Sequence, residues 1–327
     1  MESHPLPIYL GNEQHTRLDC GCMDQNMVVG QNKTARVRVP ATMANLGPGF
    51  DSLGLAVSLW LEVDAQLALQ DAFEYCGQGH VQGTNNLIHQ GFRAAFLEAG
   101  QVPPSVRLQA RNPIPLARGL GSSSAALVAG AALAAEFIGT DFDRLGVLRV
   151  CAKLEGHPDN VAPAVLGGFT ASVMQGDLPI SVSMALPANW RILVAVPNTE
   201  LKTEEARAVL PSSYSREDMV FNLSRAALWV AGVASGRWDV LQEACRDRMH
   251  QPYRAPLVPG MESAISGALE AGAIAAFLSG AGPSVTAIVN SDQTLSAVKT
   301  KLLAFSPDIL ELQPAGGFEI LTVSHGG

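Results

Sequence analysis

The chain has 327 residues, of which 47% are hydrophobic and 16% are charged, and its formal net charge is −8. The apolar share argues against a disordered protein, and the length predicts two packed domains. The acidic balance argues against nucleic acid and anionic membranes as partners. We predict a cytoplasmic protein, because the five cysteines are scattered and the sequence shows neither a signal peptide nor an apolar run long enough to cross a membrane.

The amino-terminal half begins with a polar stretch, residues 1–33, that lacks periodicity and is expected to be a disordered tail. Alternation of apolar and polar residues predicts strands at 34–40, 57–69 and 106–110 and another ending near residue 173. Apolar residues at helical spacing predict helices at 86–99, 122–138 and 143–155. Glycine and proline are frequent in the loops 40–51 and 112–121.

The pattern restarts after Pro187 with an apolar strand at 191–196, so we place a domain boundary between residues 187 and 188. The predicted domains are residues 34–187 and 188–327. Strands are predicted at 273–279, 285–289 and 318–323, and helices at 203–209, 216–234, 238–249, 261–271 and 292–304. Strands and helices do not alternate strictly, which favours an α+β fold in packed layers.

The sharpest local feature is the segment Pro115-Leu-Ala-Arg-Gly-Leu-Gly-Ser-Ser-Ser-Ala125, at the start of a predicted helix. Glycine lets the backbone approach a ligand closely, and the first helical turn offers unpaired N–H groups at the positive end of the dipole. With three serine hydroxyls these groups predict a phosphate pocket. No lysine follows the second glycine, so the segment is not a Walker A loop, and Ser124 replaces the third glycine of a dinucleotide fingerprint. A serine-capped helix after a flexible turn is the alternative.

Two more glycine-rich loops carry polar groups able to face a ligand. Residues 40–51 read PATMANLGPGFD and residues 279–284 read SGAGPS. In this order, the three segments resemble the three motifs of the GHMP kinases, and NLGPGFD with EGHPDNVAPA at 155–164 resembles the homoserine kinases among them. The resemblance covers roughly residues 34–325. It implies an amino-terminal domain of the ribosomal protein S5 domain 2 type, a ferredoxin-like carboxy-terminal domain, and ATP in the cleft between them.

The resemblance also implies a function, the transfer of the γ-phosphoryl group of ATP to L-homoserine, which gives O-phospho-L-homoserine on the route to threonine. The implied metal is Mg²⁺, held by Ser123 and Glu155, because Mg²⁺ prefers hard oxygen ligands. Many members of the family are dimers, which implies a homodimer. The residues expected to contact ATP are Asn86, Pro115, Leu116, Ala117, Arg118, Gly119, Leu120, Gly121, Ser122, Ser123, Ser124 and Ala125.

Homoserine needs a cation for its carboxylate, acceptors for its ammonium group and space for its hydroxyl beside the γ-phosphate. The resemblance assigns Arg207 and Arg254 to the carboxylate, which guanidinium groups bind bidentately. It assigns Asp51 and Asn45 to the ammonium group. The other residues expected to line the acceptor pocket are His157, Asn160 and Thr203. Taken alone, an arginine is typical of a surface salt bridge, and an asparagine before a helix is typical of a cap.

The expected catalytic residues are Asn160, Arg207 and Asp159. Phosphoryl transfer depends mainly on positioning and charge neutralisation, to which Arg118 would add a positive charge. Several relatives carry an aspartate base at the place of Asn160, so we expect no strong general base here, with Asp159 as the dissenting candidate. Met43 departs from the small serine that is common in the first motif.

Two alternatives stay open at this stage. The first is a GHMP kinase with another acceptor, such as mevalonate or a sugar, although Asp51 favours an amino acid. The second is a non-catalytic sensor that binds the same ligands. Such a sensor would be expected to lose the metal ligands, and Ser123 and Glu155 are both present.

Overall fold

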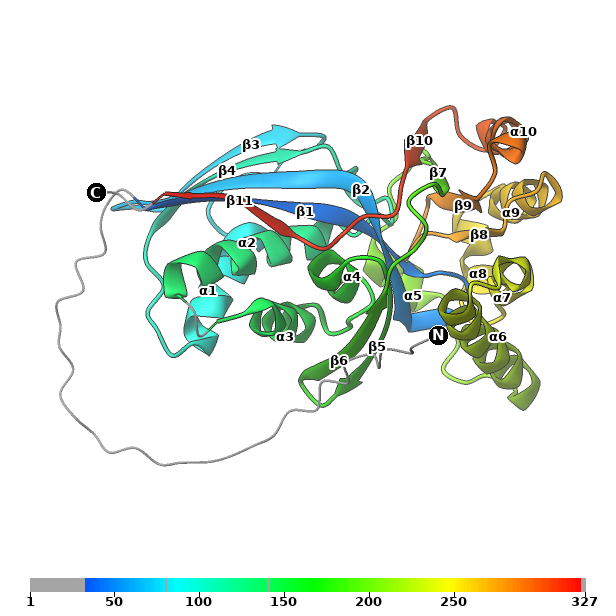
Figure 1. The fold of residues 1–327 in the computed structure, drawn as a ribbon, viewed down its shortest axis with the longest axis horizontal. Coiled ribbons are helices and arrows are strands. Elements are labelled where there is room, and N and C mark those ends of the chain that lie inside the picture. Colours follow the sequence, from blue (N-terminus) through cyan, green and yellow to red (C-terminus); the bar gives the residue numbers. More distant parts are fainter. Residues whose placement is uncertain (1–32, 80, 140–141, 325–327) are drawn as a thin grey trace, which may run out of the picture.

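The computed structural model describes residues 33–79, 81–139 and 142–324. These residues form two β-sheets covered by helices, which is the α+β arrangement expected from the sequence (Figure 1). Of the predicted tail, residues 1–33, only Lys33 lies within the described residues. Among the helices of the described ranges, none has the length and apolar character needed to cross a membrane.

The larger sheet has seven strands in the described part of the chain. They are β1 (Thr34–Asn45), β2 (Gly49–Leu67), β3 (Ala72–Gly77), β4 (Val106–Asn112), β5 (Phe169–Gln175), β6 (Leu178–Met184) and β11 (Glu319–Ser324). The main path runs β11-β1-β2-β4-β3, and the β5–β6 hairpin joins it through β2. All pairings are antiparallel except that of β3 with β4. One face of this sheet is covered by helices (Figure 1). These are α1 (Leu87–Glu98), α2 (Ser122–Ile138), α3 (Arg144–Glu155) and α4 (Val161–Leu166).

The smaller sheet is antiparallel, with the order β10-β7-β9-β8. Its strands are β7 (Arg191–Ala195), β8 (Ala275–Leu278), β9 (Val285–Val289) and β10 (Ile309–Leu312). The helices α9 (Met261–Glu270) and α10 (Asp292–Leu303) pack on its outer face (Figure 1). The remaining helical segments are α5 (Thr203–Ala208), α6 (Arg216–Ser235), α7 (Leu241–Ala244), α8 (Gln251–Arg254) and the 3₁₀ turns Trp238–Val240 and Ala255–Leu257.

The first glycine-rich segment is mostly strand, which differs from the expected loop. Strand β1 continues to Asn45 and β2 begins at Gly49, so only residues 46–48 form the turn. Three consecutive carbonyls of this turn accept hydrogen bonds from buried side chains of the carboxy-terminal half. The pairs are Trp229 Nε1 to Leu46 (2.9 Å), His250 Nε2 to Gly47 (2.7 Å) and Asn222 Nδ2 to Pro48 (3.3 Å). The backbone of the turn is therefore satisfied by residues about 175–200 positions away.

The predicted helix 238–249 begins as expected but ends early, at Ala244. The chain forms a 3₁₀ turn and the short α7, and then leaves helical geometry before α8. The carboxylate of Asp247 accepts hydrogen bonds from the backbone N–H groups of Met249, His250 and Gln251. A side chain that captures these donors competes with helix continuation.

The last strand returns to the first sheet, because β11 pairs with β1 over Thr34 to Arg38. A single boundary at 187/188 therefore separates β6 from β7 but leaves β11 with the amino-terminal sheet.

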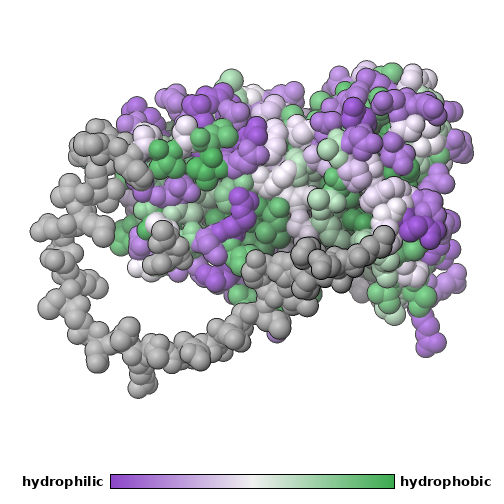
Figure 2. Space-filling view, viewed as in Figure 1, coloured by the Kyte–Doolittle hydropathy of each residue, from purple (hydrophilic) through white to green (hydrophobic). Residues whose placement is uncertain are grey.

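On the face shown in Figure 2, hydrophobic and hydrophilic residues are interspersed rather than gathered into one continuous apolar surface. The homodimer stays a prediction.

Candidate active site

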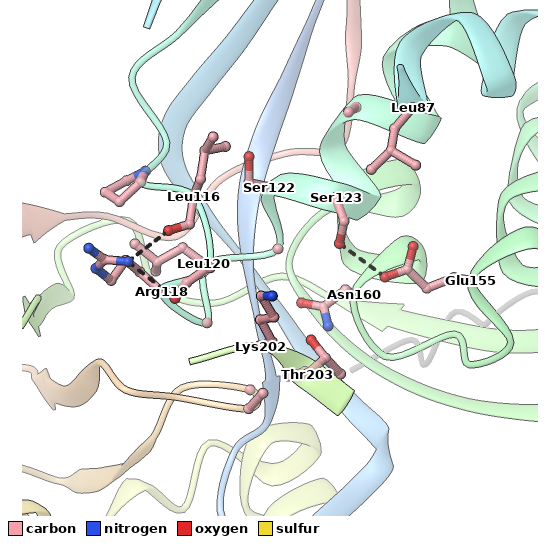
Figure 3. Close-up of a pocket in the computed structure, with 18 of the residues that line it drawn as sticks. Leu87, Leu116, Arg118, Leu120, Ser122, Ser123, Glu155, Asn160, Lys202 and Thr203 are labelled. Atoms are coloured by element: carbon pink, nitrogen blue, oxygen red, sulfur yellow. Dashed lines mark hydrogen bonds between the residues drawn. The ribbon is translucent and has the colours of Figure 1, made fainter. Parts of the chain in front are cut away.

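A cavity of about 490 Å³ lies where the three glycine-rich segments meet. Its lining includes Asp51 and the adjoining Phe50 from the first segment, residues 115–123 from the second and residues 280–282 from the third. The α3–α4 connection and α5 supply the other polar groups, and Figure 3 shows several of these side chains directed into one space. The structure thus brings together residues that are distant in the sequence.

The second segment ends in Gly121, which adopts the left-handed conformation (φ 64°) and precedes α2 without a side-chain cap. A Cβ atom at this position would lie 1.9 Å from Oγ1 of Thr42 and 3.0 Å from Oδ1 of Asn160. Glycine is therefore required both by the backbone angle and by the contact. The first turn of α2, with Ser122 and Ser123, lines the cavity and offers its N–H groups to an anion. Ser124 and Ala125 are buried behind it.

Glu155, at the end of α3, accepts hydrogen bonds from two serines of this turn. Ser123 Oγ lies 3.2 Å from its Oε1, a bond drawn in Figure 3, and Ser124 Oγ lies 3.0 Å from the same atom. Burial raises the pKa of the Glu155 carboxyl above its ordinary value, and His157 together with the two serines offsets this only in part. A half-buried carboxylate beside a serine hydroxyl is a set of hard oxygen atoms that fits Mg²⁺.

Arg118 lines the cavity and is held by backbone carbonyls. Its guanidinium donates to the backbone carbonyls of Pro197 (2.8 Å), Asn198 (2.7 Å) and Leu116 (3.1 Å), the last of which is drawn in Figure 3. These bonds fasten the second glycine-rich segment to the loop after β7. Arg118 therefore connects the amino-terminal and carboxy-terminal halves of the chain through hydrogen bonds.

Asp51 and the two predicted arginines also line the cavity. Arg207 forms a bidentate ion pair with Asp51, at 2.6 and 3.0 Å, although each was assigned to a different group of the acceptor. Arg254 is buried, and it donates to the carbonyls of Ala206 (3.1 Å) and Gly280 (3.0 Å). Burial and the nearby Arg207 lower the pKa of Arg254 to about 10, so it remains a cation at neutral pH.

His157, Asp159 and Asn160 follow α3 and also line the cavity. The Nδ1 atom of His157 lies 2.6 Å from Oδ1 of Asp159. Burial alone lowers the pKa of His157, but the hydrogen bond to Asp159 and the charges of Asp159, Glu155 and Asp51 outweigh it, so the pKa is raised. Possible ligand atoms of Asp51, His157 and Asp159 all lie within 4.8 Å of one another.

The predicted asparagines have unequal roles. Asn86 caps α1, since its Oδ1 accepts from the N–H groups of Ile88 (3.0 Å) and His89 (3.1 Å). Asn45 joins two motifs, because its Nδ2 donates to Gly280 O (3.0 Å) and its Oδ1 accepts from the N–H of Asp51 (3.1 Å). The alternative interpretation as a helix cap thus applies to Asn86, which also lines the cavity, whereas Asn45 links the first and third glycine-rich segments.

Asn160 precedes α4 but makes no side-chain cap. It instead lines the cavity, where Thr203 lies across the same space (Figure 3).

Several lining residues were missed by the sequence analysis. Phe73 and Tyr75 come from β3, a strand that was not predicted, and with Leu87 and Leu116 they form an apolar wall. Lys202 lies beside Thr203 and enters the cavity as a further cation (Figure 3). The aromatic residues at 73 and 75 alternate as in a strand, which was the one available signal for this wall.

Comparison with known proteins identifies the family. Sequence models of the GHMP kinases match in two places, the N-terminal domain over residues 86–168 and the C-terminal domain over residues 229–308. A homoserine kinase of Thermus thermophilus is 54% identical over 264 residues, which is 81% of this chain and 90% of that protein. The chain belongs to the GHMP kinases, in their homoserine kinase group.

Solved structures agree with this assignment. A homoserine kinase from Cytophaga hutchinsonii superimposes with a TM-score of 0.78 at 25% identity, covering 92% of this chain and all of that one. A putative homoserine kinase from Listeria monocytogenes gives 0.73 at 34% identity, covering 88% of this chain and 99% of the other. The expected α+β GHMP kinase fold, with its N- and C-terminal domains, is confirmed.

Replacing Gly121 by alanine should impair the second glycine-rich segment, residues 115–125, which we call the phosphate loop. The added Cβ would overlap Oγ1 of Thr42, and the left-handed backbone costs a further 1–2 kcal/mol for a residue with a side chain, by a rough estimate. We expect the KM for ATP to rise by about tenfold or more, equivalent to roughly 1.4 kcal/mol of lost binding, as measured in a steady-state kinase assay.

The matched control is Gly176→Ala in the β5–β6 turn, where φ is 61° and nothing lies within 4 Å of the added Cβ. This variant carries the same backbone strain without the contact, so its KM for ATP should match that of the wild type. Equal effects of the two substitutions would show that the change in KM reflects a general loss of stability and not a local change beside Thr42.

Proposed function

We propose that this chain is a homoserine kinase, which phosphorylates L-homoserine with ATP to give O-phospho-L-homoserine for threonine biosynthesis. The observation that carries the proposal is the Asp51–Arg207 ion pair in the cavity that contains the phosphate loop. Homoserine bears both a carboxylate and an ammonium group. It can therefore exchange partners with the pair, giving its carboxylate to Arg207 and its ammonium group to Asp51, with no charge left unpaired.

The nucleotide would occupy the end of the cavity lined by α2 and β3. Phe73, Tyr75 and Leu116 offer an apolar wall suited to a purine ring, and the first turn of α2 offers N–H groups to the phosphates. Lys202 supports the same placement, since a cation at this cavity adds to the neutralisation of the triphosphate.

Mg²⁺ would be held by Ser123 and Glu155. Their oxygen atoms meet in the cavity, and the ion, when bound, neutralises charge on the phosphoryl group that is transferred. The chain's own groups do the rest: the α2 terminus orients the triphosphate, and Arg207 orients the acceptor.

The acceptor hydroxyl would attack without a strong base. Asp159 is buried and bonded to His157, whose raised pKa favours the imidazolium form. The Oδ1 atom of Asp159 is occupied by the His157 ring, so it is not free to take the hydroxyl proton. The proton of the hydroxyl would then pass to the phosphoryl oxygen.

The acceptor is tested by measuring ADP release from ATP with L-homoserine, mevalonate, galactose or no addition. We expect strong stimulation by homoserine alone, because mevalonate supplies no ammonium group for Asp51 and galactose supplies no charge. Stimulation by mevalonate or galactose would keep the kinase activity but discard the acceptor. ATP binding without turnover of any acceptor would favour a sensor.

The metal site is tested with Glu155→Gln. Loss of the carboxylate charge should raise the Mg²⁺ concentration needed for half-maximal activity by at least about 10- to 100-fold, the range for loss of a residue that only supports a metal ligand. The control is Glu98→Gln, since Glu98 pairs with Arg149 on the surface. An unchanged Mg²⁺ requirement in Glu155→Gln would remove Glu155 from the metal site.

Asp159→Asn tests the absence of a general base. We expect kcat to fall by less than the roughly 100-fold that loss of a general base causes. The kcat is measured at saturating ATP and homoserine, and binding of both ligands is measured by calorimetry. Abolished turnover with intact binding would identify Asp159 as the base.

A further inference from the structure

We propose that Thr42 is a positioning residue that orients the side-chain amide of Asn160, so that Nδ2 of Asn160 faces the reacting groups. The inference rests on the proposed kinase function and adds a residue to it. Thr42 lies in β1, is fully buried and does not line the cavity, whereas Asn160 does. Any effect of Thr42 on the reaction must therefore pass through another residue.

Two hydrogen bonds fix the position of Thr42. Its backbone N–H donates to Leu120 O (3.1 Å), in the phosphate loop, and its Oγ1 donates to Oδ1 of Asn160 (2.9 Å). Gly121 passes so close to both side chains that a Cβ atom there would overlap them. Thr42 in β1 therefore contacts both the phosphate loop and the residue that precedes α4, through its backbone N–H and its hydroxyl group respectively.

The buried hydroxyl decides which way the amide points. A buried O–H needs an acceptor, and in the described part of the chain Oδ1 of Asn160 is the acceptor that Thr42 has. With the amide reversed, Nδ2 would donate to Thr42 Oγ1 and the hydroxyl hydrogen would lose that acceptor. The orientation with Oδ1 on Thr42 is therefore the stable one.

This orientation leaves the amide nitrogen of Asn160 for the ligand. Asn160 does not cap α4, and within the described residues its Nδ2 has no hydrogen-bond partner. An N–H donor in the cavity stabilises negative charge as it develops on the transferred phosphoryl group or on the attacking oxygen. A donor cannot remove the hydroxyl proton, which agrees with a reaction that has no strong base.

Replacing Thr42 by valine tests the inference, because valine has the same shape without the hydroxyl. We expect kcat for homoserine to fall about 10- to 100-fold, somewhat less than for complete removal of a transition-state donor. The KM for ATP and the melting temperature should change little. Thr42→Ser, which keeps the hydroxyl, should restore most of kcat.

The matched control is Thr286→Val on β9. Thr286 is also fully buried, and its hydroxyl donates to the sulfur of Met43. This control should reproduce any loss of stability in Thr42→Val without the loss of kcat. Equal kcat values for Thr42→Val and the wild type would overturn the proposal.

A double-mutant cycle separates positioning from a general structural effect. If Thr42 acts through Asn160, Thr42→Val should cause no further loss of kcat when added to Asn160→Ala. Losses that multiply in the double variant would overturn the proposal. A wild-type chain that phosphorylates another acceptor instead of homoserine contradicts the proposed function alone, and the same cycle is then measured with that acceptor.

Discussion

The site depends on the three hydrogen bonds that hold the turn between β1 and β2. The carbonyls of residues 46, 47 and 48 point into the carboxy-terminal half, where Trp229, His250 and Asn222 donate to them. Burial lowers the pKa of His250, so its ring is neutral, with Nε2–H on the turn and Nδ1 free to accept from Arg254. A neutral histidine thus connects the first motif to Arg254, which lines the cavity.

The same network reaches the third motif. The carbonyl of Gly280 accepts hydrogen bonds from both Asn45 and Arg254, and Ser279 Oγ donates to the carbonyl of Gly119 in the phosphate loop (2.6 Å). The three glycine-rich segments are therefore joined by direct bonds between backbone and buried side chains. Such a network holds the groups of a site in fixed positions without contributions from the ligand.

Local patterns in the sequence identified much of the fold and the location of the site. Helix 122–138 was predicted at its observed bounds, because an uninterrupted run of small apolar residues follows a glycine and serine start. The partners of the polar residues were not predictable. Asp51 and Arg207 are 156 positions apart, and β1 pairs with a strand at the far end of the chain. Periodicity reports which face of an element is buried, but it does not report what lies across from it.

The charge pattern inside the cavity explains how an acidic chain can hold an anionic nucleotide and a zwitterionic acceptor. Arg207 and Arg254 lie beside Asp51, so this part of the cavity carries both signs of charge within one small space. A zwitterion can pair with both signs, whereas a simple anion offers no cation to Asp51 and competes with it for Arg207. Discrimination between acceptors therefore follows from the order of charges along the cavity, and the formal net charge of −8 for the whole chain has no direct bearing on it.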